Sequence, residues 1–321
     1  MQSVIPIVGI IFFSVVLIKA ADVLATRLRK IANKTKMGGF FITALIVGLA
    51  TSLPELFVGI TSALDGVPNL SLGNAIGSNI ADVTLVAGGA ALLGGTVHIR
   101  NKAYSRDLLH AFLVGLAPLF LLLDNSLSRV DALILIAIYL FYNYDILLKR
   151  TKEVAHRETN AFVYLFRKIR KNHTEKHFMY VFLSLAVILF SADMIVKLGI
   201  DLSTSLQVPP LLIGLLFVSI GTSLPEFVVE FQAIRRHDVA VFLGDLLGSI
   251  VANGSLVVGI TTLIHPITIQ VFDEYLFATI FFLLLFLFFY FYVRTRQRLE
   301  RWEGAILIFL YIVFMVIEFS R

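Results

Sequence analysis

An internal repeat constrains this sequence more than any other feature. The stretch 48–55, Gly-Leu-Ala-Thr-Ser-Leu-Pro-Glu, recurs at 219–226 as Ser-Ile-Gly-Thr-Ser-Leu-Pro-Glu. A second stretch, 72–78, Leu-Gly-Asn-Ala-Ile-Gly-Ser, recurs at 243–249 as Leu-Gly-Asp-Leu-Leu-Gly-Ser. In both pairs the second copy follows the first by 171 residues (from 48 to 219 and from 72 to 243), and we call this distance the repeat offset. The two motifs therefore keep their separation without a gap. The chain therefore consists of two related halves, and its fold must use each motif twice.

The composition places these halves in a membrane. Of the 321 residues, 58% are hydrophobic and 15% are charged, and the mean hydropathy is +0.88. A soluble protein carries about 25% charged residues, whereas a helix that crosses a bilayer needs about 20 mostly apolar residues. We therefore predict an all-α polytopic membrane protein. Ten apolar segments approach the required length, at 3–26, 38–64, 69–94, 105–123, 128–149, 178–199, 208–234, 239–263, 273–294 and 303–319.

The distribution of basic residues agrees with ten helices. Of the 27 Lys and Arg residues, all but four lie in or beside the loops that follow every second helix, starting with the first. Because basic loops stay in the cytoplasm, we expect both chain termini outside the cell and the polar segment 150–177 inside it. The positive charge then reflects membrane orientation and not nucleic-acid binding. The four exceptions are Lys19, Arg129, Lys197 and Arg321.

The repeat and the helix count together define the organisation. Residues 1–149 are the first five-helix repeat, 150–177 a cytoplasmic linker and 178–321 the second five-helix repeat. Because five is an odd number, the two repeats have opposite orientations in the membrane. Inverted repeats with broken helices at corresponding positions indicate a transport site near the middle of the bilayer.

Each copy of the first motif interrupts an apolar segment just before a glutamate. A proline inside a helix removes a backbone hydrogen bond, and lipid tolerates this only where protein or water satisfies the freed groups. Glu55 and Glu226 follow the interruption, and an ionised group at that depth indicates function. Oxygen donors of this kind suit Na+ and Ca2+. The further expected donors are the hydroxyls of Thr51, Ser52, Thr222 and Ser223 and the carbonyls of Gly48 and Ser219.

The second motif adds polar groups on one helical face in each half. Serine is followed four residues later by Asp82 in the first half and by Asn253 in the second, a spacing that puts both side chains on one face. The Gly-xxx-Gly spacing in both copies permits close helix approach. Crossed helices would then gather three carboxylates and one amide, which suit one divalent cation or several monovalent cations. The residues are Ser78 and Ser249, with Glu55, Asp82, Glu226 and Asn253 at the centre.

Two acidic residues have no acidic counterpart in the other half. Glu230 follows Glu226 by one helical turn, and the corresponding residue is Gly59. We expect the Glu230 side chain either to line an access path to the ion site or to face the cytoplasmic end of its helix. Asp245 corresponds to Asn74, and for it we favour a hydrogen bond in helix packing over direct contact with an ion.

The paired motifs resemble those of the cation/Ca2+ exchanger superfamily, in its sodium/calcium exchanger branch and among its prokaryotic-type members. The resemblance covers both halves, with the family's two characteristic repeats at 44–88 and 215–259. It implies four adjacent cation sites, with Glu55 and Glu226 shared at a central Ca2+ site together with the carbonyls of Thr51 and Thr222. One outer site would use Thr222, Ser223, Ser249, the carbonyl of Ser219 and Glu55, and its mirror site Thr51, Ser52, Ser78, the carbonyl of Gly48 and Glu226.

The resemblance also marks two departures. The fourth site lies between Asp82 and Asn253, where a typical prokaryotic member has Asn in the first repeat and Asp in the second. The exchange leaves the total charge unchanged, so we expect the site to survive. Asp245 stands where Asn is usual, which leaves K+ dependence, stoichiometry and the counter-ion open.

These features predict a secondary antiporter that exchanges Na+ for Ca2+ by alternating access, with the first and sixth helices sliding. One alternative is a Ca2+/H+ or other cation/H+ antiporter on the same fold. A second alternative, an intramembrane hydrolase, lacks a histidine near the motifs. We expect no enzymatic activity and no cofactor apart from the transported ions, Ca2+ and Na+. The expected surroundings are the bilayer of the plasma membrane, without nucleic acid or an obligate protein partner.

Overall fold

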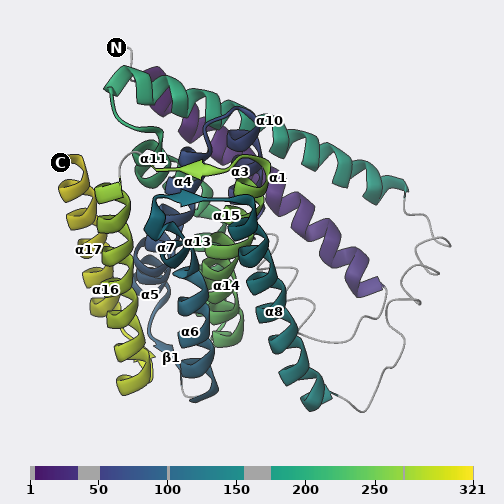
Figure 1. The fold of residues 1–321 in the computed structure, drawn as a ribbon. Helices are drawn as coiled ribbons and strands as arrows, with labels where there is room; N and C mark the ends of the chain where they lie inside the picture. The colour runs from purple at the N-terminus through teal and green to yellow at the C-terminus, as the bar shows by residue number, and fades with distance from the viewer. Residues whose placement is uncertain (1–3, 35–50, 100–101, 155–174, 270–271, 321) are drawn as a thin grey trace.

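The computed structural model describes residues 4–34, 51–99, 102–154, 175–269 and 272–320. They form a bundle of helices with two short antiparallel ribbons (Figure 1). The first half contains α1 (Val4–Lys34), α3 (Leu53–Leu64), α4 (Pro68–Ala81), the π-helical η1 (Asp82–Val86), α5 (Ala87–Gly94), β1 (Val97–His98), α6 (Lys102–Gly115), α7 (Ala117–Leu121), the 3-10 turn η2 (Leu122–Asp124), β2 (Ser126–Leu127) and α8 (Arg129–Val154).

The second half repeats this order of elements closely. It contains α10 (Glu175–Leu206), α11 (Pro210–Ile213), the π-helical η3 (Gly214–Val218), α12 (Ser219–Thr222), α13 (Leu224–Arg235), α14 (Val239–Val251), the π-helical η4 (Ala252–Val257), α15 (Val258–Ile264), β3 (Ile267–Thr268), α16 (Phe272–Arg296), β4 (Arg298–Leu299) and α17 (Arg301–Ser320).

The apolar helices confirm a polytopic helical membrane protein. Seven helical runs within the described residues are long and apolar enough to cross a bilayer, and a pair bent by 42° at Ser223 provides an eighth. Of the predicted segment 38–64 only residues 51–64 are described, and of the linker 150–177 only the two ends. The count of ten helices therefore stays a prediction. The seven runs are Val4–Leu24, Pro68–Gly94, Arg106–Asp124, Tyr180–Leu206, Val239–Ile264, Phe272–Arg296 and Arg301–Ser320.

The repeat offset relates the secondary structure as well as the sequence. The helices α3 and α13 begin and end at corresponding residues, as the bounds above show. Both α4 and α14 pass without interruption into a π-helical turn, η1 and η4. The ribbons follow the same relation, because β1 pairs with β4 while β3, the counterpart of β1, pairs with β2. Each ribbon therefore ties one half to the other.

Hydroxyl side chains account for the three π-helical turns. Thr84 Oγ1 donates to the carbonyl of Ile80 at 2.6 Å, and Ser219 Oγ donates to that of Leu215 at 2.6 Å. Ser255, which corresponds to Thr84, donates to a carbonyl four residues back in the same way. Such bonds compete with the backbone N–H for the carbonyl and widen the helix locally. The turns lie beside the two motifs, and π-helical turns are frequent at functional sites.

The long helices α1 and α10 form a separate pair. They pack along each other and lie at a slant across the other helices (Figure 1). Their interface is apolar, with Leu17 of α1 and Ile195 of α10 buried in it. On the inner side, α1 contacts α12, which lies within the second copy of the first motif. Ser14 Oγ lies so close to Gly221 that a Cβ there would come within 2.1 Å of it.

Glycines allow α4 to lie directly against α11 and η3. A Cβ at Gly73 would meet the carbonyl oxygen of Leu211 at 1.9 Å, and one at Gly77 would meet that of Leu215 at 2.3 Å. Gly214 approaches the carbonyl of Leu70 equally closely, at 2.0 Å for its hypothetical Cβ. The close approach predicted from the first Gly-xxx-Gly pattern is therefore confirmed.

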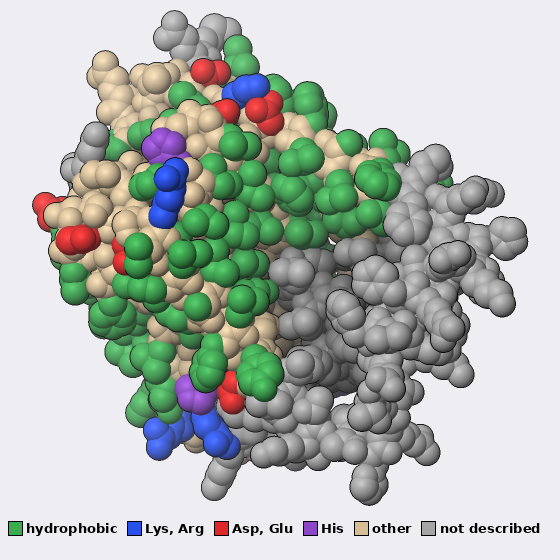
Figure 2. All heavy atoms as spheres, turned by 45° about the vertical axis from the view of Figure 1, so that its right-hand side comes forward, with side chains coloured by type: hydrophobic (Ala, Val, Ile, Leu, Met, Phe, Trp, Pro, Cys, Tyr) green, Lys and Arg blue, Asp and Glu red, His purple; other side chains and the backbone are tan. Residues whose placement is uncertain are grey.

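Large hydrophobic side chains remain exposed around the bundle. Ile5 and Phe141 are 73% and 72% exposed, and Phe291 is 66% exposed. Figure 2 shows hydrophobic side chains over most of the described surface between charged groups near the top and the bottom. An exposed apolar surface of this kind faces lipid in a membrane protein.

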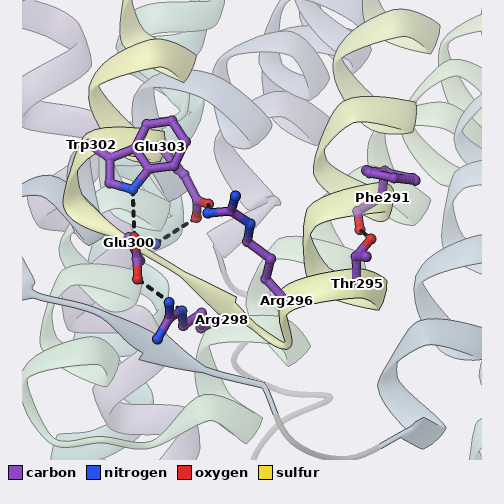
Figure 3. Close-up of polar contacts among 7 residues, drawn as sticks. All are labelled: Phe291, Thr295, Arg296, Arg298, Glu300, Trp302 and Glu303. Carbon is purple, nitrogen blue, oxygen red and sulfur yellow. Dashed lines mark hydrogen bonds and ion pairs between the residues drawn. The ribbon is translucent and has the colours of Figure 1, made fainter.

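A polar cluster fixes the turn between α16 and α17 (Figure 3). The backbone N–H of Glu300 donates to Glu303 Oε2 at 2.8 Å, and Arg296 Nη1 lies 3.6 Å from Glu303 Oε1. Arg298 and Trp302 both contact the Glu300 carboxylate, at 2.9 and 2.5 Å. The carboxylate of Glu303 caps the start of α17 and is fully buried, so its charge is compensated by the turn itself.

We expect Gly73→Ala to destabilise the protein by about 1–3 kcal/mol, because the new methyl group would meet backbone that cannot move aside. The check is the thermal unfolding midpoint of the purified protein in detergent. Gly199→Ala is the matched control, since the nearest atoms to its Cβ would be side-chain methyl groups, of Leu70 at 3.1 Å and of Ile213 at 3.6 Å, and not backbone. Equal midpoints for the two variants would contradict the backbone contact.

Candidate functional site

The two helix breaks have the same geometry. Ser52 precedes α3 with φ −81° and ψ 4°, and Ser223 precedes α13 with φ −82° and ψ 2°. A proline in the first turn of each new helix needs no backbone hydrogen-bond partner, so the break costs little there. Glu55 and Glu226 lie in these first turns, where the positive end of the helix dipole favours a carboxylate.

Each break is bonded to a helix of the other half of the chain. Thr51 Oγ1 donates to Asp245 Oδ1 of α14 at 3.0 Å. At the corresponding position, Thr222 Oγ1 donates to Asn74 Oδ1 of α4 at 3.1 Å. The two hydrogen bonds are related by the repeat offset, so Asp245 and Asn74 have equivalent places. The expected helix-packing role of Asp245 thus takes the form of a bond to a predicted ligand.

Further oxygen atoms lie next to Thr222 in the interior. Ser78 Oγ lies 3.3 Å from Thr222 Oγ1 and donates to Glu55 Oε1 at 3.5 Å. The carbonyl of Ser219 accepts from Thr222 Oγ1 at 3.3 Å and from the backbone N–H of Ser223 at 3.0 Å. Ser78 was expected beside Glu226, and in this structure its contacts are with Glu55 and Thr222.

Several buried oxygens at the site have no hydrogen-bond partner. They include one carboxylate oxygen each of Glu55 and Glu226 and both oxygens of Asp82. Asp82 lies near Ser223 without a hydrogen bond of standard geometry. An acceptor that is buried without a donor costs about 1–3 kcal/mol, more if it is charged. Further buried polar atoms without a hydrogen-bond partner include the hydroxyls of Ser223 and Ser249, the amide oxygen of Asn253 and both carboxylate oxygens of Glu230.

The acidic side chains of the site lie close enough to interact electrostatically. Glu55, Asp82 and Glu226 repel one another, and each also feels the charge of Asp245. All four are at most 2% exposed. Among the described residues no basic side chain is paired with Glu55, Asp82 or Glu226. Bound cations or protons would compensate the charges of these three carboxylates.

The donor set suits a hard cation held by mixed oxygens. Within the part of the chain that the structure describes, no three Asp, Glu, His or Cys side chains converge into a metal cluster of their own. Carboxylates, hydroxyls and a backbone carbonyl instead share the interior, a combination that Ca2+ and Na+ accept.

The structure brings together most of the residues predicted from the sequence. Thr51, Ser52, Ser78, Thr222 and Ser249 are all buried. Gly48 lies outside the described residues. Asp245 makes a hydrogen bond to another helix, as its alignment with Asn74 predicts. Glu230, for which the sequence leaves two roles open, is fully buried one turn beyond Glu226.

Comparison with known proteins identifies the family of the chain. The profile of a family described as "Sodium/calcium exchanger protein" matches residues 5–147 and 176–320. The sodium/calcium exchanger MaX1 of Methanosarcina acetivorans is 26% identical over 98% of this chain and 97% of its own length. The inner membrane protein YrbG of Escherichia coli is 29% identical over 69% of this chain and 68% of its own.

A solved structure shares the fold over the whole chain. The structure of the sodium-calcium exchanger NCX_Mj soaked with 10 mM Na+ and zero Ca2+ superposes with a TM-score of 0.65. The match has 23% sequence identity and covers 98% of this chain and 99% of that one. The profile match spans both halves and both motifs, so the chain belongs to the sodium/calcium exchanger family.

Proposed function

We propose that the chain is a secondary antiporter that exchanges Na+ for Ca2+ by alternating access at the site between the two helix breaks. The observation that carries this proposal is the set of buried, unpartnered carboxylate oxygens beside hydroxyls, with no basic side chain paired to them in the described residues. Membership in an exchanger family favours the same ions. Ca2+ and Na+ would compete for the shared carboxylates, which couples their movements in opposite directions.

Within this proposal the ligands are those that the motifs predict. Glu55 and Glu226 would share the central Ca2+ site with the carbonyls of Thr51 and Thr222. The outer sites would use the hydroxyl and carbonyl donors of the two breaks, and the fourth site would lie between Asp82 and Asn253. An exchange of several Na+ for one Ca2+ that moves one net charge is worth about 2.3 kcal/mol per 100 mV of membrane potential.

We also propose that the two halves are inverted repeats with ten membrane-spanning helices. Support comes from the matching bounds of α3 and α13, the paired ribbons and the equivalent hydrogen bonds of Thr51 and Thr222. The halves would be 1–149 and 178–321, with 150–177 and the basic loops in the cytoplasm and both termini outside. The pair α1 and α10 would slide against the rest, because it packs as a unit.

The extra carboxylates keep a Ca2+/H+ antiporter as the second candidate. Asp245 and Glu230 add buried acidic groups for which the other half has a neutral residue, and protons could neutralise them. An intramembrane hydrolase has no support, since the matched relatives with a named activity are exchangers. We propose that the chain is not an enzyme.

The topology is tested by two cysteines at corresponding positions. Asp65 and Arg236 end α3 and α13 at equivalent residues, and both are exposed. The chain has no native cysteine, so each substitution introduces a single thiol. We expect Asp65→Cys to react with a membrane-impermeant maleimide in intact spheroplasts, and Arg236→Cys to react only after lysis. Labelling of both from the same side would refute the inverted arrangement.

We expect Glu55→Gln to reduce Na+-driven Ca2+ uptake to background, because it removes a charge shared by the cations. The measurement is radioactive Ca2+ uptake into Na+-loaded proteoliposomes diluted into choline, K+ or Na+ medium. Asp193→Asn is the matched control, since that carboxylate is paired with Lys197 near the surface at 2.8 Å. Uptake that ignores Na+ but follows an imposed pH gradient would replace Na+ by H+ as counter-ion.

Asp245→Asn should fold and keep transport, since an amide oxygen can accept the Thr51 hydrogen bond as Asn74 accepts that of Thr222. The lost charge should weaken the apparent Ca2+ affinity by about tenfold, or about 1.4 kcal/mol. Asp245→Ala loses the acceptor too and should transport less than Asp245→Asn. The concentration dependence of uptake distinguishes them, and equal curves for all three proteins would exclude any role for Asp245.

A further inference from the structure

Glu230 is a buried acid that the repeat does not explain. It lies on α13 one turn after Glu226, is 0% exposed, and neither carboxylate oxygen has a hydrogen-bond partner. The corresponding Gly59 faces a hydroxyl pair, Ser71 and Thr261, whose oxygens are 2.9 Å apart. The second half has thus exchanged a glycine for a glutamate.

The residues around this position are polar near Gly59 but apolar near Glu230. By the repeat offset, Ser71 and Thr261 correspond to Phe242 and Ala90, which cannot donate a hydrogen bond. The path of α5 along α13 places Ala90 beside this point, because Gly89 lies against Phe227 and Gly94 against Ile234. At the two positions that carry hydroxyls in the other half, Glu230 therefore meets no side-chain donor, and both its oxygens lack a hydrogen-bond partner.

The charged groups that face Glu230 are all acidic. Of the helices packed against α13, α14 contributes Asp245 and η1 contributes Asp82, and both interact electrostatically with Glu230. α5 and α12 contain no ionisable residue, and the charged residues described in α1, Lys19 and Asp22, are exposed. An ionised Glu230 would be an unpaired charge among other carboxylates, which is costly by several kcal/mol.

A bound proton neutralises the Glu230 carboxylate more readily than a bound metal ion. A bound Ca2+ or Na+ needs several oxygen ligands, and Phe242 and Ala90 supply none. The neighbouring carboxylates of Asp82 and Asp245 are already engaged, Asp82 in the proposed cation site and Asp245 as the acceptor of the Thr51 hydrogen bond. A proton needs a single carboxylate oxygen and removes the charge. It is therefore the ligand whose requirements match the surroundings of Glu230.

A cavity lies at the end of the same helix. It has a volume of about 160 Å³ and is lined by His98, His237, Asp238, Ile234 and Phe242, among others. Ile234 lies one turn beyond Glu230 on the same face of α13, and Phe242 lies one turn before Asp245 on α14. A single helical turn separates the wall of this cavity from Glu230.

We propose that Glu230 is a proton-binding site coupled to cation binding at Glu55, Asp82 and Glu226. The inference rests on the proposed cation site. Glu230 carries a proton while the neighbouring site lacks Ca2+. When Ca2+ binds, its charge offsets the neighbouring carboxylates, Glu230 ionises, and the proton passes to water in the cavity. The step is a proton transfer from the Glu230 carboxyl to water and needs no other reactant.

The experiment counts protons. Full-length protein in detergent and weak buffer is mixed with Ca2+, a pH-indicator dye reports released protons, and radioactive Ca2+ reports binding. Glu230→Gln should release fewer protons for each Ca2+ bound, by up to one. Glu230→Asp, which keeps an ionisable group, should release as many as the wild type, as should Glu318→Gln, which removes a buried carboxylate from α17.

The outcomes separate this inference from the proposed function. Equal proton counts for the wild type and Glu230→Gln, both binding Ca2+, would overturn the proton site and leave the antiporter proposal intact. If Glu230→Gln does not fold, the infrared difference spectrum of the wild type and Glu230→Asp decides. A protonated carboxyl band that Ca2+ removes and that shifts in Glu230→Asp supports the site, and its absence refutes it. A wild type that binds no Ca2+ overturns both proposals.

Discussion

Buried carboxylate oxygens without donors dominate the energetics of this protein's interior. In a bilayer neither water nor lipid can satisfy them, and the described part of the chain pairs no Lys or Arg with them. In the proposed function, small cations or protons supply the compensating charge. A state without them is unfavourable, so the proposed exchange of one ion for another avoids crossing the membrane empty. The same physical cost that makes these residues rare in membranes makes them useful for coupling.

The rest of the fold serves to hold these oxygens at the breaks. The helix breaks at Ser52 and Ser223 place Glu55 and Glu226 in a first helical turn, and the crossed hydrogen bonds to Asp245 and Asn74 fix each break against the opposite half. Backbone contact at Gly73 and Gly214 brings α4 near enough for this. The π-helical turns that carry Asp82 and Asn253 then direct these side chains inward.

Departures from symmetry are informative because the two halves are otherwise so similar. At the position of Asp82 and Asn253, one half carries an acid and the other an amide. A typical prokaryotic member has the two residue types in the opposite order, so the total charge of the pair is the same. Asp245 and Glu230 instead add charge on the second half only. An added carboxylate in a lipid-embedded interior needs a compensating positive charge. This asymmetry is the physical basis for considering protons as well as Na+ in the cycle.

The sequence alone determined the class of protein, the repeat and most of the polar residues that meet in the interior. Hydropathy and length decide which segments can enter lipid, and a duplicated Pro-Glu in such a segment has few structural explanations, so Glu55 and Glu226 could be identified without coordinates. What the tertiary structure decided was which oxygens meet. The bond from Thr51 to Asp245, the contacts of Ser78 with Glu55 and Thr222, and the isolation of Glu230 depend on how α4 and α14 cross the breaks. These contacts join residues far apart in the sequence, and close packing of the helix backbones sets the distances between them. The spacing of residues along the chain does not predict those distances.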